Sequence, residues 1–120
     1  MAKPEFEFFP VSDVEYTPCA GDVPELKERV LARDEESGTA SRILRLEPGV
    51  DTTPNGVQVH DFWEEVYIVE GSFTDLTLGR TFTAGMFACR PPGMKHGPWS
   101  TTEGCTTFEV RYRTRPDDGT

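Results

Sequence analysis

The segment GVQVHDFWEEVYIVEG, residues 56–71, places His60 and the paired glutamates Glu64 and Glu65 just before the most strand-like run of the chain. Alternate side chains of a strand share a face. Gln58 and His60 therefore point the same way, and Glu64 shares their parity beyond an expected bend. One interpretation is a half-exposed strand with a polar start. The other is a metal site, because an amide, an imidazole and a carboxylate would converge and each offers a lone pair to a divalent cation.

A second segment supplies another imidazole. Residues 85–100 read GMFACRPPGMKHGPWS, in which a glycine turn, a short strand and a Pro-Pro-Gly reversal precede His96. Proline fixes φ and glycine permits a tight turn, so we expect His96 on a rigid support at the start of the next strand. His60 and His96 are the only two histidines of the chain, and both fall in these segments.

Short β-rich runs, separated by eleven glycines and ten prolines, fill most of the remaining sequence. Such runs at regular spacing predict an all-β sandwich or barrel. The segment VPELKERVLARDEE, residues 23–36, is ambiguous, because it fits either a helix that begins near Pro24 or a strand. Nothing indicates an internal repeat or a second domain.

Composition narrows the class of function. A chain of 120 residues, 36% of them hydrophobic, suits one domain with a modest core. The net charge of −9 argues against nucleic acid and an anionic membrane as partners. The absence of a signal-peptide core or a membrane-spanning apolar run leads us to expect a cytoplasmic protein. Three cysteines without a C-x-x-C pair predict reduced thiols, with Cys89 as a small core residue.

The segment around His96 resembles the second motif of the cupin superfamily, G-x5-P-x-G-x2-H-x3-N. The match runs from Gly85 through Pro91 and Gly93 to His96, and Ser100 stands where asparagine is usual.

The first cupin motif, G-x5-H-x-H-x3-4-E-x6-G, is met in part. Glu64-x6-Gly71 has its spacing, His60 takes the place of the second histidine, and Gln58 occupies the position of the first. The resemblance covers residues 40 to 112, and two motifs in order are more specific than one.

The resemblance implies a jelly-roll β-barrel in a single domain. Residues 40–113 would form the barrel core, and residues 1–39 would form a strand or helix extension that packs on it. Residues 114–120 would be a flexible tail. Cupins commonly form homodimers, and the apolar run FEFFPV at residues 6–11 is large for one small barrel to cover.

The resemblance also implies one divalent metal ion, held by Gln58, His60, Glu64 and His96. The Gln-x-His arrangement is similar to that of the zinc-binding, cupin-type phosphomannose isomerases. The run HDFWEEVYIVEG instead resembles small bacterial cupins of the acetylacetone-cleaving dioxygenase and ChrR-like groups. Fe(II) and Zn(II) are therefore the expected ions, with nickel and manganese as further options. If Gln58 only forms hydrogen bonds, two histidines and one carboxylate remain, the pattern of non-heme Fe(II) sites.

Three functions follow from these alternatives. We favour a dioxygenase-type C–C cleavage, with Fe(II), of a small substrate rich in carbonyl, enolate or carboxylate oxygens. The others are a zinc-dependent isomerase or lyase and a non-catalytic metal-binding sensor. Glu64 and Glu65 are the candidate catalytic groups. We expect most strand arginines to face outward, whereas an inward one would anchor a carboxylate or enolate.

Overall fold

The computed structural model describes residues 2–114 and is built almost entirely from strands. The elements are η1 (Val11–Asp13), β1 (Thr17–Pro18), β2 (Leu26–Arg33), β3 (Ala40–Leu46), η2 (Thr53–Asn55), β4 (Trp63–Asp75), β5 (Arg80–Thr83), β6 (Phe87–Arg90), β7 (Trp99–Ser100) and β8 (Cys105–Tyr112). Both η elements are single 3-10 turns. None of the helices within residues 2–114 is long and apolar enough to cross a membrane.

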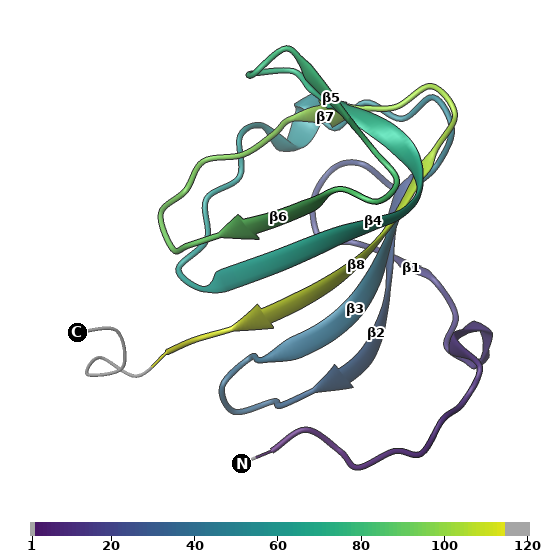
Figure 1. Cartoon of the computed structure of the whole chain (residues 1–120), viewed down its shortest axis with the longest axis vertical. Helices are drawn as coiled ribbons and strands as arrows, with labels where there is room; N and C mark the ends of the chain where they lie inside the picture. The colour runs from purple at the N-terminus through teal and green to yellow at the C-terminus, as the bar shows by residue number, and fades with distance from the viewer. Residues whose placement is uncertain (1, 115–120) are drawn as a thin grey trace.

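All eight strands belong to one curled antiparallel sheet (Figure 1). Its order is β1-β2-β3-β8-β4-β5, and β6 and β7 also pair with β4. The first part of β4 pairs with β6 and β8, and its last residues, from Ser72 onward, pair with β5 and β7. The predicted single-domain, all-β jelly roll is confirmed.

β4 turns from one half of the sheet to the other at Gly71. The φ of Gly71 is +80°, a conformation that side chains other than glycine rarely adopt, and a Cβ here would collide with the carbonyl oxygen of Gly104. The glycine that closes the first motif is thus required by the bend in the longest strand.

The ambiguous segment forms β2, not a helix. β2 pairs with β3 from Leu26 opposite Leu46 to Arg33 opposite Ala40, with an irregularity between Val30 and Ala32. Residues 26–33, which we assigned to an extension that packs on the barrel, are therefore an integral part of the sheet. The tail predicted over residues 114–120 lies, apart from Thr114, outside the described residues.

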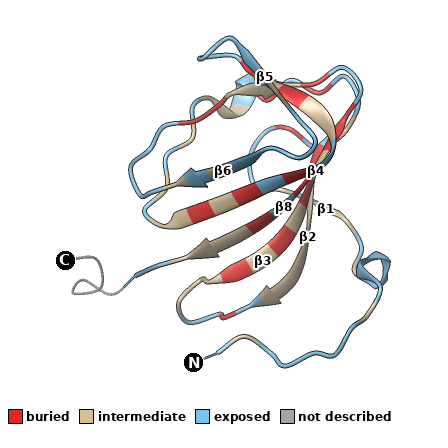
Figure 2. Ribbon diagram, in the orientation of Figure 1, coloured by how far each residue is buried: buried red, intermediate tan, exposed pale blue. Residues whose placement is uncertain are grey.

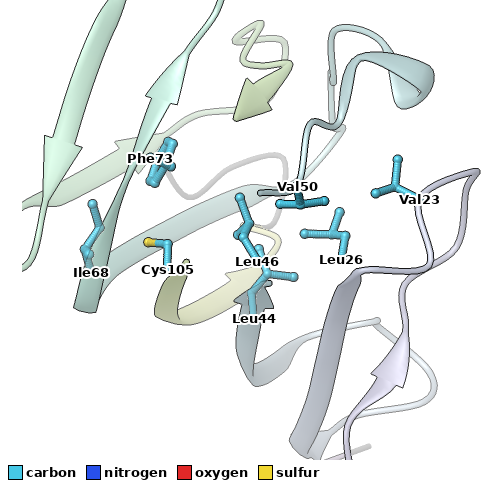
Figure 3. Close-up of a cluster of buried hydrophobic side chains, with 8 residues drawn as sticks. All are labelled: Val23, Leu26, Leu44, Leu46, Val50, Ile68, Phe73 and Cys105. Atoms are coloured by element: carbon cyan, nitrogen blue, oxygen red, sulfur yellow. The ribbon is translucent and has the colours of Figure 1, made fainter. Parts of the chain in front are cut away.

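The concave side of the sheet holds the core. Buried and partly buried residues alternate along β3 and the first part of β4, as expected when one face of a sheet is covered (Figure 2). Figure 3 shows the central cluster, which consists of Val23, Leu26, Leu44, Leu46, Val50, Ile68, Phe73 and Cys105. All three cysteines are free. Cys89 is exposed, so its assignment to the core was wrong, because its position on β6 faces away from the concave side.

The convex face carries an exposed row of aromatic side chains. Tyr67 on β4 lies opposite Phe87 on β6 and Phe108 on β8, and all three are exposed. The N-terminal Phe6 and Phe8 are also exposed, Phe8 completely. Within the described chain, the row, Phe6 and Phe8 remain exposed, whereas Phe9 is partly buried and packs against Phe6.

Candidate metal centre

The structure brings together three of the four predicted ligands. His60 precedes β4, Glu64 lies near its start, and His96 lies between β6 and β7. One possible ligand atom from each residue lies within 4.8 Å of the others. The Nε2 atom of His96 is 3.9 Å from Oε1 of Glu64, and the two imidazole centroids are 4.9 Å apart. This spacing fits a cation placed between them.

Main-chain hydrogen bonds hold the two histidine segments together. The N–H of Gln58 donates to the carbonyl of His96 at 2.7 Å, and the N–H of His96 donates back at 3.0 Å. The N–H of Gly93, which has a φ of +87°, donates to the carbonyl of His60 at 2.9 Å. The Pro-x-Gly part of the second motif thus joins the two ligand segments.

The hydrogen bonds of His96 leave one nitrogen for a cation. Its Nδ1 lies 3.2 Å from the carbonyl oxygen of Met94, which assigns the proton to Nδ1 and a lone pair to Nε2. Nε2 is buried, has no hydrogen-bond partner within residues 2–114, and faces Glu64. A buried polar atom of this kind requires a partner, and this tautomer is the one that metal-bound histidines use.

Both histidines are held in the neutral form that binds metals. Burial, assisted by Arg90 and His60, lowers the pKa of His96 to about 4. Burial also lowers the pKa of His60, and Glu64 opposes this effect.

Glu64 is buried but remains ionised. Burial alone would raise its pKa, yet Arg111, Arg42 and Arg90 together outweigh burial and lower the pKa below its ordinary value. Nε of Arg111 donates to Oε2 at 2.7 Å, and Nη1 of Arg90 donates to Oε1 at 3.3 Å. The carboxylate is therefore a full negative charge beside two neutral imidazoles.

Gln58, the fourth predicted ligand, lines the same cavity. Its amide nitrogen donates to the carbonyl oxygen of Asn55 at 2.9 Å, so the amide oxygen is the atom left to coordinate a cation. Its role as a ligand stays a prediction.

Glu65, the second candidate catalytic group, lies on the other face of β4 from Glu64. Its carboxylate accepts a hydrogen bond from the hydroxyl of Tyr112 at 2.6 Å, and among residues 2–114 it is not part of the cavity lining. Because neighbouring residues of a strand point to opposite faces, the carboxylates of Glu64 and Glu65 cannot contact the same metal ion or substrate. Glu65, predicted as a catalytic group, therefore lies outside the candidate centre.

The candidate centre belongs to a cavity of about 280 Å³. Apolar side chains of the concave face, among them Leu44, Val66, Phe73 and Trp99, line it together with the three candidate ligands. Polar and charged side chains make up the rest of the lining, and a cavity that combines an apolar wall with convergent polar groups suits a small, oxygen-rich molecule.

Arginines also line this cavity, contrary to the expectation that most would face outward. Arg42, Arg90 and Arg111 are among its lining residues. Strand parity could have revealed two of them, because Arg42 shares a face with Leu44 and Arg111 shares a face with buried Glu109.

A curled jelly-roll sheet with two histidines and a glutamate converging on its concave cavity defines a small cupin with a candidate metal centre. The chain belongs to the ChrR cupin-like family, whose model matches residues 6–113. No curated protein matches the chain significantly.

Solved structures share the fold at low sequence identity. An RmlC-like cupin from Shewanella frigidimarina is 23% identical, with 98% of each chain covered and a TM-score of 0.70. The polyketide cyclase RemF from Streptomyces resistomycificus is 22% identical over 93% of this chain and 82% of its own, with a TM-score of 0.70. An acetylacetone dioxygenase from Acinetobacter johnsonii is 16% identical over 91% of this chain and 75% of its own, also with a TM-score of 0.70. These likenesses establish the fold.

Proposed function

We propose that this protein is a metal-dependent enzyme that acts on a small, oxygen-rich substrate, with the ion bound by His60, Glu64 and His96. The observation that carries the proposal is the buried Nε2 of His96, which has no hydrogen-bond partner among residues 2–114 and faces an ionised carboxylate and a second neutral imidazole. These donors suit a borderline divalent cation. When bound, the ion would polarise a carbonyl or enolate oxygen of the substrate.

For the reaction, we favour a dioxygenase-type C–C cleavage of a β-dicarbonyl compound with Fe(II) and O2. Two histidines and one carboxylate are the ligand set of non-heme Fe(II) oxygenases, and such a set leaves coordination positions open. The similar fold of an acetylacetone dioxygenase is consistent with this choice.

The residues of the chain would orient the substrate and exclude water. The apolar lining of the cavity would surround the carbon skeleton, while Glu64 and the two histidines would fix its oxygens through the ion. Cys19 also lines the cavity, but burial raises the pKa of its thiol to about 11. At neutral pH this thiol is protonated and is therefore a poor nucleophile.

One observation favours a second candidate, a zinc-dependent isomerase or lyase. Because Asn55 holds the amide nitrogen of Gln58, the amide oxygen is available as a fourth ligand. Four protein ligands would suit zinc. A closed set of four would also suit the third candidate, a non-catalytic sensor, since it would leave no position for a substrate.

Metal analysis of protein purified without a chelator or a metal-affinity tag tests these proposals. We expect about one equivalent of metal in the wild type. Iron together with O2 consumption on addition of acetylacetone or a related β-dicarbonyl compound supports the dioxygenase, and zinc without O2 consumption supports the second candidate. Protein that binds neither ion, even after incubation with each of them, contradicts the proposed function.

A further inference from the structure

Two arginines flank Glu64 from the neighbouring strands. In the sheet, Glu64 on β4 lies directly opposite Arg90 on β6 and Arg111 on β8. Each arginine donates one hydrogen bond to this carboxylate, from Nη1 of Arg90 and from Nε of Arg111. The guanidinium groups of Arg90 and Arg111 carry two positive charges, and the Glu64 carboxylate between them carries one negative charge.

The third cavity arginine, Arg42, makes its shorter contacts elsewhere, although its Nη2 also lies 3.8 Å from Oε2 of Glu64. Arg42 donates from Nε to Glu109 at 2.9 Å and from Nη1 to Glu28 at 2.7 Å, so two carboxylates surround one guanidinium. The remaining arginine in the lining, Arg33, pairs with Glu35. Arg90 and Arg111 thus form the part of the cavity in which positive charge is in excess.

A bound metal ion would increase this excess. A divalent cation would bind the same Glu64 carboxylate that Arg90 and Arg111 contact, and it would add two positive charges to the site. An anionic ligand would offset this excess, because opposite charges attract each other more strongly in a partly buried site than in bulk water.

Arg90 and Arg111 also have donors to spare. A guanidinium group carries five N–H donors in a planar fork, and each arginine uses one of them on Glu64. Within residues 2–114, the structure shows no hydrogen-bond partner for the others. The guanidinium carbon of Arg111 lies 5.0 Å from the ring centroid of Phe62, and that of Arg90 lies 5.7 Å from that of Trp99. These aromatic contacts help to hold the two groups in place.

From this arrangement we infer that the substrate carries a carboxylate, bound by Arg90 and Arg111, next to the carbonyl or enol oxygen that faces His60, Glu64 and His96. The substrate class is a small β-keto acid and not a neutral β-diketone. This inference rests on the proposed function and adds the charge of the substrate to it. A cavity of about 280 Å³ lies near the lower end of the usual range for ligand sites, which suits a short acid.

Calorimetric titration with two probes tests the inference. Acetoacetate has a carboxylate, and methyl acetoacetate has the same carbon chain with that group esterified and uncharged. We expect metal-loaded wild type to bind acetoacetate at least about tenfold more tightly, because hydrogen bonds to a charged group have this effect on affinity. Equal affinity for the two probes would overturn the inference without the use of any variant.

Substitutions then assign the preference to the two arginines. Arg90→Gln and Arg111→Gln should each weaken acetoacetate binding about tenfold or more, leave the affinity for the ester nearly unchanged, and retain the metal. Arg113→Gln is the matched control, because Arg113 pairs with Asp61 and does not line the cavity; it should change neither affinity. If both cavity variants fold, as judged by circular dichroism, and keep the wild-type preference, the inference is wrong.

Metal content separates this inference from the proposed function. Metal-loaded protein that binds both probes equally would refute the carboxylate site and leave the metal centre intact. Wild type that binds no metal would refute the proposed function. The inference could still be decided with that metal-free protein. It would stand if the protein prefers acetoacetate to the ester and if Arg90→Gln and Arg111→Gln each abolish that preference.

Discussion

Replacing Glu64 with glutamine tests two roles of one side chain. Its carboxylate is only 3% exposed and accepts hydrogen bonds from Arg111 at 2.7 Å and from Arg90 at 3.3 Å. Removing one partner of a buried ion pair costs about 3 to 5 kcal/mol. The side chain of Arg111 is 25% exposed and glutamine still offers an acceptor, so we expect about 2 to 3 kcal/mol here. For a domain of this size, that loss lowers the Tm by about 8 to 15 °C.

Glu109→Gln is the matched control. The side chain of Glu109 is also 3% exposed, lines the same cavity, and pairs with Arg42 at 2.7 Å. It is not one of the three clustered ligand candidates. We expect a similar loss of stability in both variants, measured by thermal unfolding in the presence of a chelator. Only Glu64→Gln should lose bound metal, measured on separate samples prepared without a chelator.

Each outcome has a definite meaning. A Glu64→Gln variant that keeps one equivalent of metal is incompatible with Glu64 as a ligand. Unchanged stability would mean that the two arginine contacts contribute nothing to folding. If Glu109→Gln loses the metal as well, the loss reflects a general disturbance of the cavity.

Four other predictions concern the remaining features. His96→Ala should lose the metal while its far-ultraviolet circular dichroism stays that of the wild type, because the change removes a ligand and not part of the central core; full metal content would exclude His96 as a ligand. In metal-free protein, the free energy of unfolding should decrease as the pH falls from 6.5 to about 4. Burial lowers the pKa of His96 to about 4, so in this range the unfolded chain binds a proton and the folded chain does not; pH-dependent urea denaturation should show a smaller decrease for His96→Gln. Gln58→His should tighten the binding of nickel, copper and zinc, measured by competition with a chelator, and Gln58→Leu should weaken it; unchanged affinity in Gln58→Leu would make the amide a bystander. We further propose a homodimer that covers the exposed N-terminal phenylalanines: removal of residues 1–10 should weaken it in light scattering, and a monomeric wild type at micromolar concentration would contradict it.

Strand parity and spacing predicted much of the fold and of the candidate centre. His60 and Glu64 share a parity within one segment, and His96 follows a turn that proline and glycine define. These are local properties of the sequence, and the structure brings the three side chains together.

The features that sequence missed depend on pairing between distant strands. Arg90 and Arg111 meet at Glu64 only because β6 and β8 both pair with β4, and no local pattern specifies that arrangement. Likewise β2 is a strand because β3 satisfies its main-chain hydrogen bonds, although its residues also fit a helix.

The main-chain connections among Gln58, His60, Gly93 and His96 have a consequence for the evolution and redesign of this protein. Because the backbone itself joins the two loops, the side chains at positions 58, 60 and 96 are not needed to hold them together. Donor groups can therefore be exchanged one at a time on an unchanged support. Relatives of this chain could acquire a different ion, or lose the ion altogether, by single substitutions, and a designer could vary the donor set without rebuilding the protein around it.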